Sequence, residues 1–342
     1  MTIKRILGMP IALAALAGVA AAALSLTGAG ATFPYPMYSK WFSDYHKLHA
    51  DTEINYQSIG SGGGIKQVTE GTVDFGATDG PMNDTQLAEF KTKRKCDVLH
   101  FPTVLGADVP TYNIPGITGE LNFTPEALAG IFLGKITKWN DPEIAKANPG
   151  VKLPASDVVV VHRSEASGTT YIWVDYLAKI SPEWKSKVGV AAAVAWPVGL
   201  GSKGNEGVSG QIKQTEGAIG YVELIYAIQN KMTYGKVKNA AGVFVKAELK
   251  SVTEAAAGAA ANMPEDFRVS ITNAPGKGAY PISSFTWLLV PNKFQDPAKK
   301  KAVTEFLTWM LGPGQKMSEA LSYAPLPKAV VAKELKAISN IQ

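Results

Sequence analysis

The chain contains one cysteine, four histidines and four arginines among its 342 residues. The single cysteine, Cys96, excludes an intramolecular disulfide, and it lies too far from the amino terminus to carry a lipid anchor. The histidines, His46, His49, His100 and His162, are scattered along the sequence, so none of them belongs to a cluster with metal-ligand spacing. We therefore expect no metal and no cofactor.

Positive charge is modest as well. The formal net charge is +5, and removal of Lys4 and Arg5 with a targeting segment would leave +3. So small an excess, with so few arginines, does not indicate nucleic-acid binding. The sequence also has no Gly-x-x-x-x-Gly-Lys-Ser/Thr loop and no Gly-x-Ser-x-Gly elbow, the motifs of nucleotide hydrolysis and of esterases. We predict that the protein is not an enzyme.

A long apolar run occurs at the start of the chain. Lys4 and Arg5 precede Ile6 to Ala23, which ends in small residues and matches a secretory signal peptide, predicted here as residues 1–24. A retained signal anchor is the alternative, but the run is rich in alanine and glycine and short for a membrane span. We therefore expect a mature protein that diffuses freely in the periplasm.

The remaining composition is balanced, with 46% apolar and 18% charged residues, and supports two α/β domains. Two extended apolar passages, at residues 99–114 and 282–290, are suited to carry the chain from one domain to the other and back. We predict a lobe I made of residues 25–106 and 283–342, and a lobe II made of residues 107–282.

The stretch from His162 to Thr170 has the pattern of an anion site between a strand and a helix. The β-branched run Val158 to Val161 predicts a strand buried on both faces, and the apolar spacing after Tyr171 predicts a helix. Either Ser167 or Thr169 can cap that helix. Unpaired backbone N–H groups at such a helix start can bind a small anion.

Charged side chains accompany this helix start. Arg163 can present a two-pronged guanidinium to the same anion, and Glu165 can hold that guanidinium in place. An ordinary capped helix beside a surface ion pair is the alternative interpretation. An enzyme hypothesis would make Ser167 a nucleophile with His162 as its base, but no pattern in the sequence orients that base.

Two further helix starts resemble the first. Thr32 is placed as the cap of a helix that follows a Gly/Ala turn, with Pro34 in the first turn. A strand at residues 54–59 leads into the glycine cluster Gly60 to Gly64 and a helix. Asp79 lies at the carboxyl end of another short strand, where ligands of open α/β sheets collect.

Other segments are assigned by their local patterns. Thr124, Asp141 and Ser181, each followed by proline and glutamate, predict three helix starts. The glycine-rich stretch Gly199 to Gly210 is expected to be a loop, and Lys91 to Lys95 is expected to be a solvated loop beside an incidental thiol.

Several motifs in register give the chain a family resemblance. Over essentially the whole mature chain it resembles the periplasmic phosphate-binding proteins of the phosphate-specific ABC import system. The motifs that carry the resemblance are residues 27–34 (TGAGATFP), 59–64 (IGSGGG), 73–79 (VDFGATD), 101–104 (FPTV), 133–136 (LGKI), 167–169 (SGT), 196–201 (WPVGLG) and 217–223 (GAIGYVE).

The resemblance implies a two-lobed type II venus-flytrap fold of the α/β class, each lobe a mixed sheet flanked by helices. It also implies a monomer that binds one inorganic phosphate between its lobes and passes it to an ABC permease and ATPase complex in the inner membrane. Matched position by position, the family's phosphate ligands fall on Thr32, Phe33 through its backbone, Ser61, Asp79, Arg163, Ser167, Gly168 and Thr169, with Glu165 behind Arg163. Gly62 replaces a serine common in the family, and Glu165 replaces an expected aspartate.

Asp79 is the residue that bears on ligand choice. A carboxylate only accepts hydrogen bonds, so it suits a protonated phosphate and disfavours sulfate, which carries no proton at neutral pH. Two alternatives keep the same fold: a receptor for another oxyanion such as sulfate or molybdate, and a surface phosphate sensor or scavenger without an import role.

Overall fold

The computed structural model describes residues 23–342. Residues 1–22, which hold most of the predicted signal peptide, lie outside the described part. No helix between residues 23 and 342 is both long enough and apolar enough to cross a membrane.

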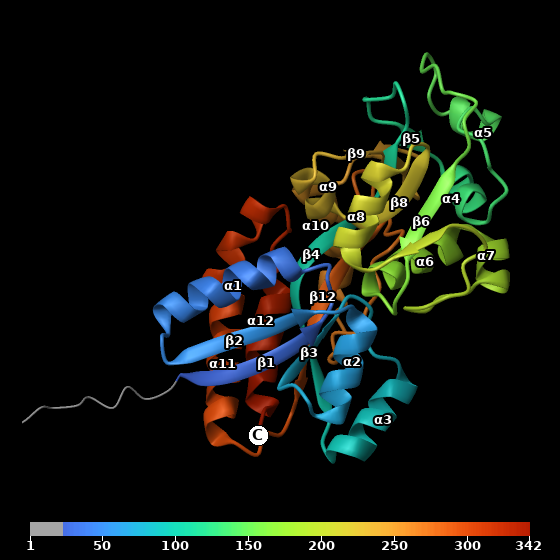
Figure 1. Ribbon diagram of the computed structural model, residues 1–342. Helices are drawn as coiled ribbons and strands as arrows, with labels where there is room; N and C mark the ends of the chain where they lie inside the picture. The colour runs from blue at the N-terminus through green and yellow to red at the C-terminus, as the bar shows by residue number, and fades with distance from the viewer. Residues whose placement is uncertain (1–22) are drawn as a thin grey trace, which may run out of the picture.

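Lobe I is built on a mixed sheet, shown in Figure 1. Strand β1 runs parallel to β2 and β3, whereas β12 runs antiparallel to β3 and β4. The strands are β1 (Leu24–Gly30), β2 (Thr52–Ser58), β3 (Phe75–Thr78), β4 (Val98–Asn113) and β12 (Ser283–Pro291). The parallel strands β1 and β3 therefore end at the same edge of the sheet, where Asp79 and the residues after Gly30 follow them.

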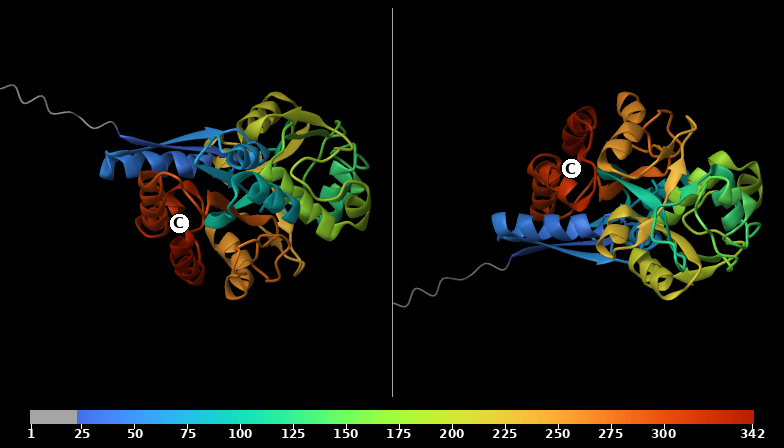
Figure 2. Two further views of the ribbon diagram at one scale, coloured as in Figure 1. Left: turned by 90° about the horizontal axis from the view of Figure 1, so that it is seen from below. Right: turned by 90° about the horizontal axis from the view of Figure 1, so that it is seen from above.

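Helices cover both faces of this sheet, as the views from above and below show (Figure 2). On one face α1 and α11 meet the sheet through Phe42, Phe75 and Phe306. On the other face Val68 of α2 and Phe90 of α3 join a second apolar cluster. The helices of lobe I are α1 (Tyr35–Leu48), α2 (Ser61–Glu70), α3 (Asp84–Arg94), α11 (Pro297–Leu311) and α12 (Lys328–Ala337), with the 3₁₀ turns η1 (Pro313–Met317), η2 (Glu319–Leu321) and η3 (Ile338–Asn340).

Lobe II has its own mixed sheet. Strand β8 lies between β4 and β6, antiparallel to the first and parallel to the second. Its other strands are β6 (Val159–Arg163), β7 (Leu200–Ser202), β8 (Ala218–Glu223) and β9 (Thr233–Tyr234), and a small separate sheet contains β5 (Asn122–Phe123), β10 (Lys236–Lys238) and β11 (Phe244–Val245). The helices are α4 (Pro125–Phe132), α5 (Pro142–Ala145), α6 (Gly168–Ile180), α7 (Pro182–Lys187), α8 (Gly204–Gln214), α9 (Leu224–Gln229) and α10 (Leu249–Ala261).

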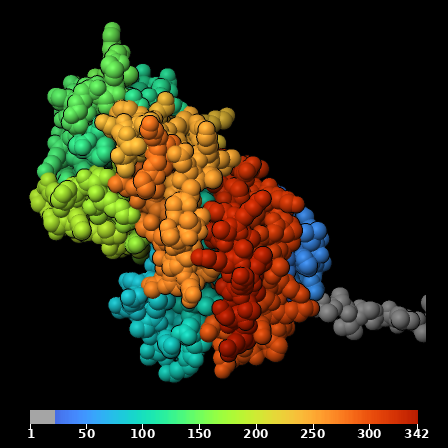
Figure 3. All heavy atoms as spheres, turned by 180° about the vertical axis from the view of Figure 1, so that it is seen from behind, coloured from blue at the N-terminus to red at the C-terminus, as the bar shows by residue number. Residues whose placement is uncertain are grey.

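Strand β4 belongs to both sheets. Its first part, to Ala107, pairs with β12, and its second part, from Asp108, pairs with β8. The chain returns beside it, because the Asp108 backbone N–H donates to the Ile282 carbonyl at 2.9 Å. From behind, α10 and the residues that follow it lie alongside the C-terminal helices (Figure 3). The fold is thus the predicted two-lobed α/β fold, with neighbouring crossovers between the lobes.

Several local predictions are confirmed. Thr124, Asp141 and Ser181 each cap the predicted helix through the side chain. The two extended passages become β4 and β12.

Three local predictions were wrong. Gly199 to Gly210 is not a loop but β7 followed by helix α8, because Val208 and Ile212 pack in the core and outweigh the low helix propensity of glycine. Lys91 to Lys95 is not a loop but the last turn and the C-cap of α3. Thr32 does not cap α1, which begins at Tyr35 after Pro34, so the Thr32 hydroxyl is free for other contacts.

One buried acid gives a prediction for stability. The Glu334 side chain on α12 is fully buried and neither carboxyl oxygen has a partner in the described residues. Burial raises its pKa well above the ordinary value. The folded protein therefore keeps a proton that the unfolded chain releases above about pH 4, so this residue lowers stability as the pH rises.

We expect Glu334→Met, which needs no partner, to raise the free energy of unfolding by about 1–3 kcal/mol at pH 8 and by less at pH 5, measured by urea denaturation. Glu305→Met, on an exposed position of α11, is the control and should change little at either pH. A Glu334→Met variant that is less stable than the wild type at pH 8 would contradict this account.

Candidate functional site

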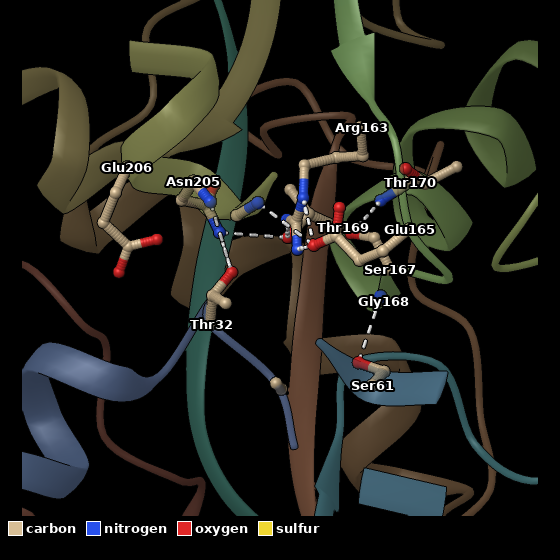
Figure 4. A network of polar contacts seen from close by, with 12 residues as sticks. Thr32, Ser61, Arg163, Glu165, Ser167, Gly168, Thr169, Thr170, Asn205 and Glu206 are labelled. Atoms are coloured by element: carbon tan, nitrogen blue, oxygen red, sulfur yellow. Dashed lines mark hydrogen bonds and ion pairs between the residues drawn. The ribbon is translucent and has the colours of Figure 1, made fainter. Parts of the chain in front are cut away.

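The predicted anion site lies between the end of β6 and the start of α6. Of the two candidate caps, Ser167 is the one used: its side-chain oxygen accepts from the Thr170 N–H at 3.1 Å. The N–H of Gly168, the first residue of α6, donates to the hydroxyl oxygen of Ser61 in lobe I at 3.0 Å. The start of the lobe II helix thus faces lobe I, as Figure 4 shows.

Arg163 supplies a buried positive charge at this helix start. Its side chain is 1% exposed, and its Nε donates to Glu165 Oε1 at 2.9 Å, with a second, shorter contact from Nη2 to the same oxygen. Nη1 donates to the Thr169 hydroxyl oxygen at 3.1 Å. These three bonds leave one N–H on each terminal nitrogen, enough for the two-pronged contact that guanidinium makes with an oxyanion.

Glu165 also fixes the neighbouring helix. The same Oε1 accepts from the backbone N–H of Gly204 at 3.1 Å, at the start of α8. Gly204 has φ = 73°, a conformation that favours glycine. The glutamate that replaces the expected aspartate therefore reaches both Arg163 and α8.

Asp79 contributes a buried carboxyl from lobe I. It follows β3 and is 1% exposed; its Oδ1 accepts from the Thr286 hydroxyl at 2.8 Å, and its Oδ2 has a long contact with the Ser61 hydroxyl at 3.5 Å. Burial raises the pKa of Asp79 to about 7, against the opposing effects of Thr286, Arg163 and Ser61. At neutral pH this carboxyl is therefore close to the midpoint between its protonated and ionised forms.

The two lobes lie close together at Gly168. A Cβ atom at this position would lie 2.5 Å from Asp79 Oδ2 and 2.5 Å from Ser61 Oγ, so no larger residue fits without moving them. A second contact joins the lobes nearby, where the Gly62 N–H donates to the Ala166 carbonyl at 2.9 Å. Gly62, which replaces a serine common in the family, thus lies at the contact between the lobes.

Thr32 and Phe33 enter the cluster from lobe I. The Tyr226 hydroxyl of lobe II donates to the Thr32 carbonyl at 2.6 Å, and the Tyr323 hydroxyl donates to the Phe33 carbonyl at 2.5 Å. Both residues are buried. These bonds hold the turn between β1 and α1, which contacts the start of α8 through Thr32 and Asn205.

The sequence analysis missed one polar residue in the middle of this cluster. Asn205, on α8, is fully buried, and its Nδ2 donates to Thr32 Oγ1 at 2.8 Å and to Thr169 Oγ1 at 3.2 Å (Figure 4). It was missed because its segment was read as a glycine-rich loop. The eight predicted residues are thus brought to one place, where Asn205 joins them.

Two buried acids also lie behind the cluster. Asp108 and Glu223 face each other directly across β4 and β8, and both are fully buried. Burial, together with nearby acids including Asp79, raises the pKa of each carboxyl well above its usual range. Burial thus favours the neutral form of both acids, which would limit negative charge around the site.

The residues of the enzyme hypothesis do not form a nucleophile and base. His162 Nδ1 bonds to the Arg163 carbonyl at 2.9 Å, and its ring stacks on Trp196 at 4.8 Å between centroids. The Ser167 oxygen accepts from the Thr170 N–H, and no hydrogen bond joins it to His162 among the described residues. Between residues 23 and 342 no His, Cys, Asp and Glu side chains are grouped closely enough to hold a metal.

Comparisons with known proteins place the chain in a family. Residues 16–313 match the model of the PBP superfamily domain. The phosphate-binding protein PstS of Xylella fastidiosa is 46% identical over 315 residues, which cover 92% of this chain and 84% of that protein. The chain belongs to the PstS family. The PstS of Pasteurella multocida is 45% identical over 312 residues, which cover 91% of this chain and 89% of that protein.

Solved structures agree with the PstS fold. A high-affinity periplasmic phosphate-binding protein called PfluDING, solved with bound phosphate, superposes with a TM-score of 0.71 at 22% identity, covering 91% of this chain and 93% of that one. The phosphate-binding protein of Stenotrophomonas maltophilia gives a TM-score of 0.71 at 20% identity, covering 92% and 93%. At these identities the match supports the type II periplasmic-binding-protein fold, as predicted.

The Asp79 environment gives a prediction for titration. A hydroxyl that donates to a carboxylate stabilises its charged form, so Thr286→Val should raise the pKa of Asp79 above about 7. Carbon-13 NMR of the carboxyl in anion-free buffer measures this midpoint. Thr308→Val, which alters an exposed hydroxyl on α11, is the control. An unchanged midpoint in Thr286→Val would show that this bond does not influence Asp79.

Proposed function

We propose that this protein binds one inorganic phosphate between its two lobes and delivers it to an ABC permease and its ATPase in the inner membrane. The observation that carries the proposal is the similarity to PstS proteins over more than nine-tenths of the chain. Under this proposal the mature protein is a periplasmic monomer without catalytic activity, and it takes no nucleic acid as a partner. Its lobes divide at residues 106/107 and 282/283, near the bond between Asp108 and Ile282.

The proposed phosphate ligands come from both lobes. Thr32, Phe33, Ser61 and Asp79 contribute from lobe I, and Arg163, Ser167, Gly168 and Thr169 contribute from lobe II. Removing an anion from water is costly unless its oxygens receive new donors. The hydroxyls, the helix-start N–H groups and the two remaining N–H groups of Arg163 supply such donors without a cluster of cations.

Asp79 makes the site selective for an anion that carries a proton. The carboxylate and the anion can share one hydrogen bond only if a proton lies between them. Phosphate brings a proton at neutral pH and sulfate does not. With sulfate, an ionised Asp79 would face another acceptor in a buried site, an arrangement that disfavours sulfate as long as Asp79 is charged. This argument favours phosphate over the alternative of another oxyanion.

Arg163→Lys tests the guanidinium contact. Lysine keeps the charge but loses the planar fork and the clamp to Glu165, so phosphate affinity should fall by roughly 10- to 100-fold. Isothermal titration calorimetry at neutral pH and low salt measures the change. Lys152→Arg, an exchange at an exposed position of lobe II, is the control and should bind as the wild type does. Wild-type affinity in Arg163→Lys would place Arg163 outside the binding site.

Asp79→Asn tests the basis of selectivity. The amide can turn its NH₂ group toward either anion, so phosphate binding should survive while sulfate binding becomes measurable. Because the pKa of Asp79 is raised to about 7, the wild type should itself bind sulfate better at pH 5.5 than at pH 8, as protonated Asp79 becomes a donor. The asparagine variant should lose this pH dependence.

Both proteins are titrated with both anions at both pH values. An asparagine variant that rejects sulfate as strongly as the wild type would mean that discrimination lies elsewhere in the site. Delivery to a permease is a separate question from binding: a receptor that binds phosphate but does not restore phosphate uptake to cells lacking their own PstS would fit the sensor or scavenger alternative instead.

A further inference from the structure

We propose that Asn205 is a positioning residue that turns two threonine hydroxyls, one from each lobe, into donors for the bound anion. The inference rests on the proposed function, because it names a residue through which that same site would work. The side-chain amide of Asn205 is bonded to Glu223, Thr32 and Thr169. It acts through Thr32 of lobe I and Thr169 of lobe II, both of which it bonds.

The orientation of the Asn205 amide is fixed by its neighbours. Its Oδ1 accepts from the backbone N–H of Glu223 at 2.9 Å. A backbone N–H can only donate, so the atom that faces it must be the amide oxygen. The NH₂ group consequently faces the two hydroxyls, and its two hydrogens serve Thr32 Oγ1 at 2.8 Å and Thr169 Oγ1 at 3.2 Å.

The hydroxyl of Thr169 then has both lone pairs engaged. Its oxygen accepts from Asn205 Nδ2 and from Arg163 Nη1, the latter at 3.1 Å. A hydroxyl has two acceptor sites and one hydrogen, so the hydrogen of Thr169 must point to a third partner that accepts. An oxyanion has only acceptor oxygens to offer apart from any proton that it carries.

The hydroxyl oxygen of Thr32 also accepts two hydrogen bonds. Its oxygen accepts from Asn205 Nδ2 and, at a longer 3.4 Å, from the Asn205 backbone N–H. Thr32 does not cap α1, so its hydrogen bonding is not used for that helix. Asn205 thereby orients one hydroxyl of each lobe so that its hydrogen is available to donate to an anion. It can orient both hydroxyls only when the two lobes are in contact.

The rest of the cluster explains why an amide, and not another side chain, occupies this position. Arg163, Glu165 and the start of α8 already balance charge, so an added charge at residue 205 would disturb them. An aspartate would accept from the threonines and reverse their hydroxyls, which would then present lone pairs to an anion. A neutral side chain that donates on one side and accepts on the other meets both demands.

The test is a double-mutant cycle on phosphate affinity. Asn205→Ala should weaken phosphate binding by roughly 10- to 100-fold in the wild-type background. In a Thr32→Val, Thr169→Val background the same change should weaken it by less than about threefold, because the hydroxyls through which Asn205 acts are gone. Equal losses in both backgrounds, or wild-type affinity in Asn205→Ala, would overturn the proposal.

Controls separate this inference from loss of structure and from the proposed function. Asn239→Ala removes another buried asparagine, which bonds only to backbone groups of its own lobe, and should lower stability without changing phosphate affinity. If Asn205→Ala does not fold, Asn205→Asp keeps the bond to the Glu223 N–H and should lose at least as much affinity. Failure of the wild type to bind phosphate would refute the proposed function itself, whereas a wild type that binds and an Asn205→Asp variant that binds equally well would refute only the role of Asn205.

Discussion

The site depends on the buried guanidinium of Arg163. A charge removed from water must be compensated locally, and Glu165 does this through one oxygen that also holds the start of α8. The ion pair is electrically close to neutral, so an anion beside it is bound chiefly by directed donors. This requirement explains why two helix starts and several hydroxyls converge on the same point.

The charge of the buried carboxyl groups near Arg163 also determines whether the site can hold an anion. Asp79, Asp108 and Glu223 are all buried near Arg163, and three ionised carboxylates there would repel any anion strongly. Burial, with repulsion from nearby acids including Asp79, raises the pKa of Asp108 and of Glu223 and so favours their neutral forms. Asp79 differs from these two acids because its pKa is about 7, so near neutral pH it can be ionised and accept a proton that a ligand carries.

The sequence allowed the frame of the fold to be predicted, because its signals are local. The Ser/Thr/Asp-Pro-Glu helix starts at Thr124, Asp141 and Ser181 specify their own caps. Asp79 follows a short apolar strand, so its place at the edge of the sheet also follows from local pattern. The proposed ligand set was predicted from the family resemblance, which rests on sequence motifs and not on the spacing of apolar residues.

What could not be predicted depends on contacts between distant segments. Helix α8 contains Gly204, Gly207 and Gly210, and local propensity alone favours a loop there. Packing of Val208 and Ile212 against the sheet overrides that preference. Asn205 was therefore overlooked, and the role of Thr32 was assigned to a helix cap because its partner lies 173 residues away.

The contacts between the lobes bear on how closure and binding are linked. Those at the site are few and polar: Gly62 to Ala166, Gly168 to Ser61, Asn205 to Thr32, and Tyr226 to Thr32. A single hydrogen bond exposed to water in the open form contributes only about 0.5–1.5 kcal/mol, so these bonds alone favour closure weakly. An anion that receives donors from both lobes adds interactions that exist only in the closed form, and closure is then governed by the ligand. Because Asn205 bonds to a hydroxyl of each lobe, the same closure also completes the orientation of the donors.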